Sequence, residues 1–174
     1  MSNISLSRTQ IFDLFHGLND ELAGQNVIGE IYLVGGAVMC LCFNERLSTN
    51  DVDAIFQPKE ILRKAAAKIA DALHLAPDWL NDAVKGYLSP RGEFTLFLEL
   101  SNLRIFAAQP EYLLAMKCLA MRLGAEFRDE QDVRFLLRYL NIERVERAVE
   151  IITRYYPLER FPQKTLYALE ELLR

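Results

Sequence analysis

Hydrophobic and polar residues follow two successive patterns along this chain. Up to Gln109, stretches with helical spacing alternate with short strand-like runs, and from Pro110 onward the hydrophobic residues recur only at helical spacing. In the first part the pattern predicts helices at 6–23, 37–43, 58–73 and 78–88, and strands at 27–34, 51–56, 94–100 and 103–107. In the second part it predicts helices at 110–123, 129–140, 142–156 and 163–173. We therefore expect an α+β fold, with a small mixed sheet and flanking helices in residues 1–109 and an all-helical C-terminal subdomain in residues 110–174.

Composition narrows the class of protein. The chain has 174 residues, of which 51% are hydrophobic and 25% charged, and a net charge of −4, so neither a membrane span nor a general nucleic-acid-binding surface is expected. The N-terminus has no basic segment followed by an apolar one, so we expect a cytoplasmic protein. The cysteines are Cys40, Cys42 and Cys118; their odd number and spacing favour buried thiols over a disulfide or a zinc site.

The segment from Glu30 to Phe56 contains the strongest candidate chemistry. An apolar strand ends in Gly35-Gly36, a short helical run follows, and a second apolar strand carries Asp51 and Asp53. Two glycines at a strand-to-helix joint let the backbone approach a ligand closely, and the following helix N-terminus offers N–H groups to an anion. Aspartates two residues apart on a strand point to the same face. This spacing predicts a phosphate pocket beside a metal site.

If the strand is buried, the two aspartates require a cation to balance their charge. Two carboxylates held together in an apolar strand repel each other, and burying them unpaired would cost several kcal/mol. Mg²⁺ prefers oxygen ligands and substrate phosphates, so it is the expected ion, with Mn²⁺ as the alternative. Taken separately, a Gly-Gly turn and an Asp-x-Asp pair are each common in ordinary turns and caps.

A second group of charged residues interrupts the apolar faces of the C-terminal helices. Lys117 falls on the stripe that contains Leu113, and Asp129 and Asp132 extend the stripe of the next helix upstream. One interpretation is structural, with Asp129 as a helix cap and a lysine–aspartate salt bridge between two helices. The other is functional, with Lys117 directed at a triphosphate and an aspartate completing the site. The roles of Asn81 and Asp82 stay open between lining the pocket and capping a helix.

These motifs carry a resemblance to a known family. The order hydrophobic-Gly-Gly, helix, Asp51-x-Asp53 resembles the nucleotidyltransferase superfamily, whose members have the polymerase-beta-like fold. The phrase RLSTNDVDAIF looks like the prokaryotic members of uncertain role, and PEYLLAMKCLAMR…RDEQDV is similar to the AbiEii-type toxin nucleotidyltransferases. The resemblance covers roughly residues 28–57 and 110–137, and it makes residues 1–109 a nucleotidyltransferase-like core.

The resemblance implies transfer of a nucleoside monophosphate from an NTP to an RNA, such as tRNA, or to a protein acceptor. Asp51 and Asp53 would then hold the metal and, with Lys117 and Asp129, form the catalytic group. The nucleotide would be bound by a set of five residues, namely Gly35, Gly36, Arg46, Thr49 and Lys117. It also implies a role in a toxin–antitoxin or defence pair, with a cognate antitoxin as partner.

Two departures from the family pattern support a second hypothesis. The second glycine of the turn is often serine in the family, and here Gly36 lacks that hydroxyl. Many members add a third carboxylate on a later strand, for which Glu99, Asp129 and Asp132 are the candidates. Without such a carboxylate, the protein would be a catalytically inactive nucleotidyltransferase-like module that binds a nucleotide or a protein.

Overall fold

The computed structural model describes residues 4–121 and 128–174, and the chain folds into two compact units. The first unit contains residues 1–86 and 94–108, and the second contains residues 87–93 and 109–174. The second unit therefore takes a short segment from within the range that the sequence assigned to the first domain. The predicted helix at 110–123 ends at Leu119, and its last two residues lie outside the described part of the chain.

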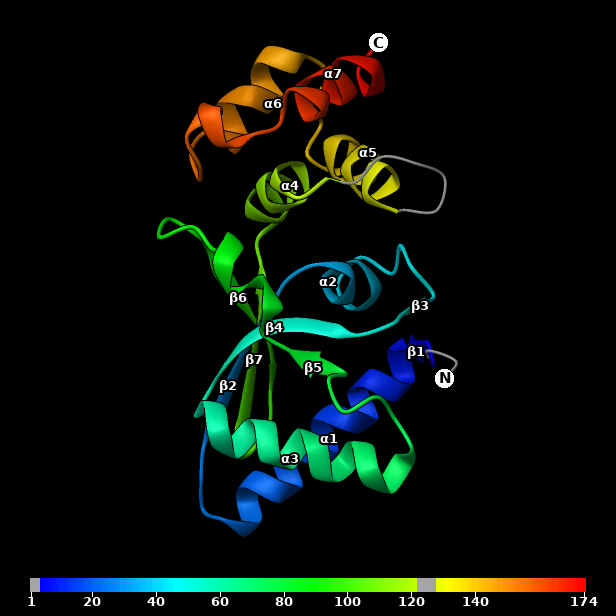
Figure 1. Ribbon diagram of the computed structural model, residues 1–174, viewed down its shortest axis with the longest axis vertical. Coiled ribbons are helices and arrows are strands. Elements are labelled where there is room, and N and C mark those ends of the chain that lie inside the picture. Colours follow the sequence, from blue (N-terminus) through cyan, green and yellow to red (C-terminus); the bar gives the residue numbers. More distant parts are fainter. Residues whose placement is uncertain (1–3, 122–127) are drawn as a thin grey trace. The chain divides into compact units, whose positions relative to one another are not determined.

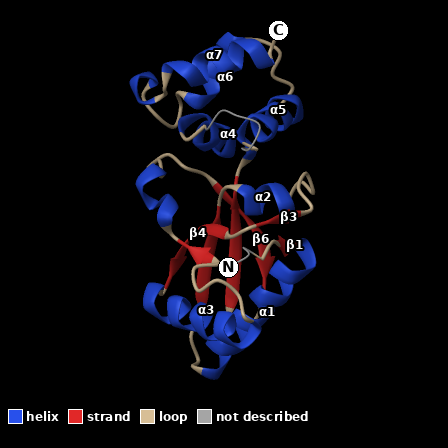
Figure 2. Ribbon diagram, turned by 45° about the vertical axis from the view of Figure 1, so that its right-hand side comes forward, coloured by secondary structure: helices blue, strands red, loops and turns tan. Residues whose placement is uncertain are grey.

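The first unit combines helices and strands (Figures 1 and 2). Its helices are α1 (Arg8–Gly24), α2 (Gly36–Leu41) and α3 (Lys59–Leu73), with a 3₁₀ turn, η1, at Ala83–Tyr87. Its strands are β1 (Leu6–Ser7), β2 (Gly29–Leu33), β3 (Ser48–Thr49), β4 (Val52–Gln57), β5 (Leu80–Asn81), β6 (Phe94–Glu99) and β7 (Leu103–Ala108). The expected mixed α+β class is confirmed.

Five of these strands form a mixed sheet in the order β5-β4-β2-β7-β6. Strand β2 is antiparallel to β4 and parallel to β7, whereas β5 is parallel to β4 and β6 is antiparallel to β7. The short strands β1 and β3 pair separately, with Leu6 opposite Thr49. Because β2 and β4 run in opposite directions, the turn after β2 lies beside the beginning of β4. This places the glycine pair next to the aspartates.

Alternation along β2 separates the two faces of the sheet. Ile31 and Leu33 are fully buried on the face that α1 and α3 cover (Figure 1). Tyr32 points to the opposite face, where its ring stacks on Phe106 at 4.8 Å between ring centroids and meets Phe94 edge-on. The hydrophobic core therefore forms from residues that recur every second position in the strands and about every 3.6 positions in the helices.

Within the described residues, no helix is long and apolar enough to cross a membrane.

The second unit is helical. Its helices are α4 (Pro110–Leu119), α5 (Asp129–Tyr139), α6 (Val145–Ile152) and α7 (Gln163–Leu172), with a 3₁₀ turn, η2, at Leu158–Arg160. Segment 87–93 joins these helices through side-chain hydrogen bonds. The backbone N–H of Ser89 donates to the Tyr112 hydroxyl at 2.9 Å, the Ser89 hydroxyl donates to the carbonyl of Tyr155 at 2.5 Å, and the Tyr156 hydroxyl donates to the carbonyl of Tyr87.

Two expectations about local structure are wrong. The predicted helix at 78–88 is instead strand β5 followed by η1, because the backbone N–H of Val52 at the edge of the sheet bonds to the Trp79 carbonyl at 2.6 Å. The second concerns residues 44–50, for which the sequence predicts neither a helix nor a strand and which contain β3. In both places the backbone conformation is decided by a pairing strand far away in the sequence, which the local hydrophobic pattern cannot reveal.

Candidate functional site

The glycine pair forms the turn between β2 and α2. Gly35 has φ +68° and ψ −149°, a conformation that favours glycine, and a Cβ at this position would lie 3.1 Å from Oδ2 of Asp53. A Cβ at Gly36 would lie 2.6 Å from Nη1 of Arg46 and 3.1 Å from Oγ1 of Thr49. The missing side chains therefore let a carboxylate and a guanidinium group pack closely against the backbone of the turn.

Helix α2 contributes less to this cradle than the sequence suggested. It has six residues, too few for a substantial helix dipole, so the positive charge of the turn comes mainly from Arg46. Arg46 is half-buried, and its charge opposes the rise in the pKa of Cys40 that burial causes. Thr49 is buried, and its hydroxyl donates to the backbone carbonyl of Asp51 at 3.1 Å. Thr49 thus shapes the turn that leads into β4.

Asp51 and Asp53 lie at the start of β4. Asp53 is the second residue of the strand, whereas Asp51 directly precedes it, and both side chains are half-buried between fully buried neighbours such as Val52. Their backbone is fixed from both sides, since the N–H of Val34 donates to the Asp53 carbonyl at 3.0 Å and β5 pairs along the other edge. The structure therefore brings together Gly35, Gly36 and the two aspartates.

Asn81, whose role the sequence left open between lining the pocket and capping a helix, lies beside the two aspartates. It lies directly opposite Asp53 in the parallel pair of β4 and β5, and its Nδ2 donates to Oδ2 of Asp51 over a long 3.4 Å. No local signal could decide between these two roles, because the pattern of this segment predicts a helix and the structure has strand β5 there. Its neighbour Asp82 has a different role: it forms ion pairs with Lys59 at 3.0 Å and with Arg63 at 3.5 Å.

The candidates for a third carboxylate do not join this group within the first unit. Glu99 ends β6, on the opposite edge of the sheet from β5, where its exposed carboxylate pairs with Arg104 at 3.4 Å. Across the described residues, no group of three or more histidine, cysteine or acidic side chains is arranged to hold a metal ion. The oxygen donors at the start of β4 are thus two carboxylates beside a neutral amide, a set that suits a hard cation such as Mg²⁺.

Lys117, Asp129 and Asp132 form a buried charged cluster in the second unit. Nζ of Lys117 lies 2.7 Å from Oδ2 of Asp132 and 3.8 Å from Oδ1 of Asp129, and the three side chains are 11%, 2% and 8% exposed. This is the helix-to-helix salt bridge of the structural interpretation, since Lys117 lies on α4 and both aspartates lie in the first turn of α5. The proposed contact of Lys117 with phosphates stays a prediction.

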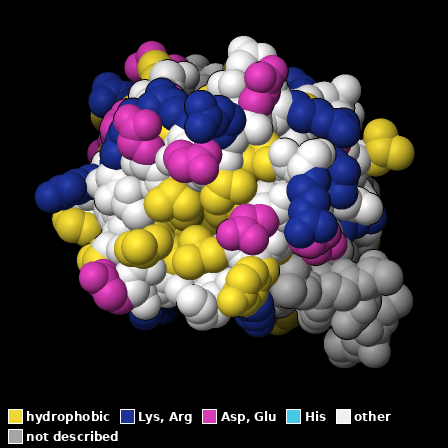
Figure 3. All heavy atoms as spheres, turned by 90° about the horizontal axis from the view of Figure 1, so that it is seen from above, with side chains coloured by type: hydrophobic (Ala, Val, Ile, Leu, Met, Phe, Trp, Pro, Cys, Tyr) yellow, Lys and Arg dark blue, Asp and Glu magenta, His cyan; other side chains and the backbone are white. Residues whose placement is uncertain are grey.

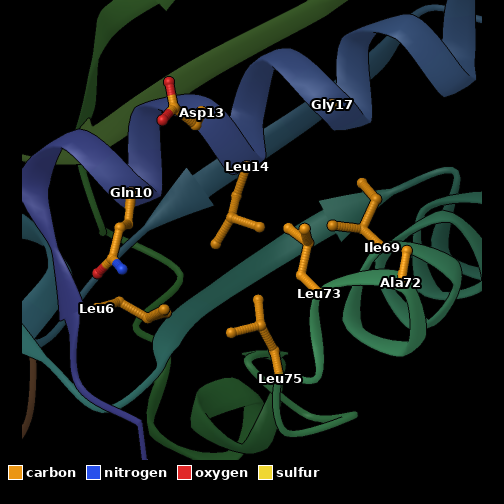
Figure 4. Close-up of a pocket in the computed structure, with 9 residues that line it drawn as sticks. All are labelled: Leu6, Gln10, Asp13, Leu14, Gly17, Ile69, Ala72, Leu73 and Leu75. Atoms are coloured by element: carbon orange, nitrogen blue, oxygen red, sulfur yellow. The ribbon is translucent and has the colours of Figure 1, made fainter.

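An apolar groove in the first unit lies apart from the predicted site. It has a volume of about 470 Å³ and is formed by β1, α1, α3 and the residue Leu75 after α3. In Figure 4 the leucine side chains point toward one another while the Asp13 carboxylate is directed away from them. None of the residues predicted to bind nucleotide or metal lines it. Nine residues form its wall: Leu6, Gln10, Asp13, Leu14, Gly17, Ile69, Ala72, Leu73 and Leu75.

The helical unit also exposes hydrophobic side chains. Figure 3 shows a cluster of them on the face that carries α6 and α7, surrounded by charged side chains of both signs. The large exposed hydrophobic side chains of the helical unit include Tyr139 of α5, Leu158 of η2 and Tyr167 of α7, which are 53%, 47% and 63% exposed. Mixed charge around an apolar centre does not resemble the basic surface that binds a nucleic-acid backbone.

Comparison with known proteins finds no matching family model, no matching curated protein and no matching solved structure. The possible chemistry of the site therefore follows from its own residues. Half-buried carboxylates, a glycine turn and a guanidinium group are the kinds of group that bind a cation and a polyphosphate.

Proposed function

We propose that this protein is a magnesium-dependent nucleotidyltransferase, which transfers a nucleoside monophosphate from an NTP to an RNA or protein acceptor. One observation carries the proposal: the turn at Gly35-Gly36 is closed on one side by Asp53 and on the other by Arg46. A triphosphate and its cation are bound by groups of opposite charge, and the turn has one such group at each glycine. The mixed sheet with α1 and α3 on one face is compatible with a nucleotidyltransferase core.

The reaction would be an in-line displacement at the α-phosphorus. An acceptor hydroxyl oxygen forms the new bond to phosphorus, the bond from that phosphorus to the oxygen bridging to the β-phosphate breaks, and pyrophosphate leaves. The hydroxyl proton passes to a carboxylate or to water. Such reactions are accelerated mainly by positioning and by stabilisation of charge on the phosphoryl oxygens.

The residues of the first unit would share this work. Asp51 and Asp53 would hold Mg²⁺, which when bound neutralises charge on the phosphates and orients them. The N–H groups of Gly35 and Gly36 and the guanidinium of Arg46 would bind phosphate oxygens, and Thr49 would keep the turn before β4 in shape. In this arrangement Arg46 supplies the contact that a serine hydroxyl at position 36 makes in related enzymes.

The remaining assignments rest on the resemblance alone. These are Lys117 as a phosphate contact, Asp129 as part of the catalytic group, and a toxin or defence role with an antitoxin partner. The buried ion pairs of Lys117 give it a structural role in the helical unit whether or not it contacts a nucleotide.

Labelling assays test the activity. Purified protein is incubated with Mg²⁺ and each α-labelled NTP, together with total tRNA or a protein pool, and the wild type is compared with Asp51→Asn/Asp53→Asn. Asp82→Asn is the matched control, because it also removes a carboxylate near β5 but leaves the pair intact. We expect label transfer by the wild type and the control, and a loss of at least about 100-fold in the double variant. Equal labelling by wild type and double variant would contradict the proposal.

A second function is favoured by one specific observation. Among the described residues no third carboxylate joins Asp51 and Asp53 in a metal-binding group, and the residue opposite Asp53 is the neutral Asn81. The protein could then be a nucleotidyltransferase-like module that binds a nucleotide, or a protein, without turnover. Calorimetry separates the two: NTP binding that survives chelation of Mg²⁺, together with no label transfer to any acceptor, would support the binding module.

A further inference from the structure

We propose that Asn81 is a positioning residue of the Asp51–Asp53 site, which holds the Asp51 carboxylate in place for a divalent cation. The inference rests on the proposed function, because it requires that the two aspartates bind a cation. Asn81 is neutral, so the charge of the site comes from the two carboxylates. All three residues belong to the first unit.

Strand pairing places Asn81 beside the aspartates. In the parallel register Val52 lies opposite Leu80 and Asp53 lies opposite Asn81, so the side chains of Asp53 and Asn81 point to the same face of the sheet. The strand is fixed by Trp79, which is 1% exposed and donates its ring N–H to the carbonyl of Ala66 in α3 at 3.0 Å. The position of Asn81 is thus set by the core.

Hydrogen bonds at both ends of its amide set the orientation of Asn81. Its Oδ1 accepts from the backbone N–H of Ala83 at 3.2 Å, which identifies the oxygen end. Its Nδ2 donates to the carbonyl of Asp78 at 3.3 Å and to Oδ2 of Asp51 at 3.4 Å. The amide therefore offers its N–H group to the carboxylate. An aspartate here would instead place a third negative charge against Asp51.

The next residue, Asp82, does not take part in this contact with Asp51. The carboxylate of Asp82 pairs with Lys59, and a hydrogen bond from that ammonium group is the main cause of a lowered pKa at Asp82. The negative charge of Asp82 is therefore paired with basic residues of α3.

Removing a residue that orients a metal-binding carboxylate typically weakens metal affinity by about 10- to 100-fold. Asn81 has the position and the donor to be such a partner.

Mn²⁺ binding tests the proposal without reference to activity. Free Mn²⁺ is measured by electron paramagnetic resonance during titration of wild type, Asn81→Ala, Asn81→Asp and Asp82→Asn, with thermal unfolding as a check on folding. We expect Asn81→Ala to weaken Mn²⁺ binding about 10-fold, and Asp82→Asn to bind like the wild type. Asn81→Asp keeps an oxygen for the N–H of Ala83 and adds a charge, so we expect it to bind Mn²⁺ at least as tightly as the wild type and to gain more thermal stability from the ion.

The outcomes distinguish a failure of the role of Asn81 from a failure of the cation site. If Asn81→Ala binds Mn²⁺ like the wild type, if Asp82→Asn weakens binding equally, or if Asn81→Asp binds more weakly than Asn81→Ala, the role of Asn81 is overturned. If instead the wild type binds no Mn²⁺ that Asp51→Asn/Asp53→Asn removes, the cation site of the proposed function fails, and the role of Asn81 fails with it.

Discussion

Gly36 and Arg46 share one small space, so a larger residue at position 36 would compete with the guanidinium group for it. A side chain at residue 36 would meet the guanidinium group of Arg46 at 2.6 Å. The end of an arginine side chain can move away, so the substitution is tolerated by the fold but removes the cation from the turn.

The contribution of Arg46 to the proposed phosphate binding can be tested with Gly36→Ala, which adds a Cβ but no hydroxyl. Because Arg46 would be displaced, we expect a non-hydrolysable NTP analogue to bind about tenfold more weakly, a loss of about 1.4 kcal/mol that matches one charge-assisted hydrogen bond. Calorimetry measures the affinity. Gly24→Ala is the control, since a Cβ at Gly24 meets nothing within 4 Å. Binding by Gly36→Ala as tight as by the wild type would show that Arg46 does not contact the phosphates.

Burial of the thiols makes stability depend on pH in the alkaline range. Desolvation raises the pKa of Cys118 from its ordinary value of 9.0 to about 12. The thiol stays neutral in the folded protein while it ionises in the unfolded chain above about pH 9, so the stabilisation present below that pH is lost progressively up to about pH 12. One such group contributes a slope of up to about 1.4 kcal/mol per pH unit.

Urea unfolding of wild type and Cys118→Ala between pH 8 and pH 10.5 measures this slope. The variant loses packing at every pH, so its free energy of unfolding is lower throughout. We expect the difference between the two proteins to shrink above pH 9, because only the wild type carries the Cys118 titration. A constant difference across the range would mean that the thiol ionises equally in the folded and unfolded states.

At the scale of elements, α4 and α5 are joined by a buried ion pair instead of a continuous apolar seam. Lys117→Met would leave Asp132, which is 2% exposed, without its lysine, and breaking a buried pair in this way costs about 3 kcal/mol. We expect Lys117→Met/Asp132→Leu to recover most of that loss, because two apolar residues can pack where the charges were.

Urea denaturation of the single and double variants gives the coupling energy between the two side chains. The exposed pair of Glu111 and Arg154 at 3.6 Å is a suitable control, and Glu111→Gln should cost at most about 1 kcal/mol. If Lys117→Met costs no more than this control, the lysine is not held by the pair, and the functional interpretation of Lys117 gains support.

The extent to which the sequence predicts each element depends on where its partners lie. Helix α1 was predictable in detail, because Ser7 caps it and Gln10 completes a capping box within four residues. Strand β5 was not, because Trp79 and Asn81 take their conformation from β4, which lies about 28 residues earlier. The glycines and aspartates of the candidate site could be found because they are close in sequence. The role of Asn81, in contrast, could be assigned only once its strand pairing with β4 was known.

For the whole molecule, the decisive feature is that the chain passes between its two units more than once. Segment 87–93 leaves the first unit before β6 and packs on the helical unit, and the chain then returns to complete the sheet. Gly92 allows this, because any Cβ there would overlap the ring of Tyr112. A close approach of backbone to an aromatic ring is a position that only glycine fits.

Gly92→Ala should therefore release this segment. We expect trypsin to cleave after Arg91 at least about 10-fold faster than in the wild type, since about 1.4 kcal/mol of lost attachment raises the open population by that factor. Gly86→Ala, where a Cβ meets nothing within 4 Å, should digest like the wild type. Equal cleavage rates for the two variants would mean that the Tyr112 contact does not hold the segment.

The attachment of segment 87–93 also has a consequence during synthesis. Domains generally begin to fold on the ribosome in order from the N-terminus. The hydroxyl of Ser89, however, bonds to the carbonyl of Tyr155, which is translated 66 residues later. The sheet can form while this segment is still a solvated loop, and the loop acquires its final partners only when the last helices emerge. A nascent chain stalled before Tyr155 should therefore be open to proteases at Arg91, although its sheet is already complete.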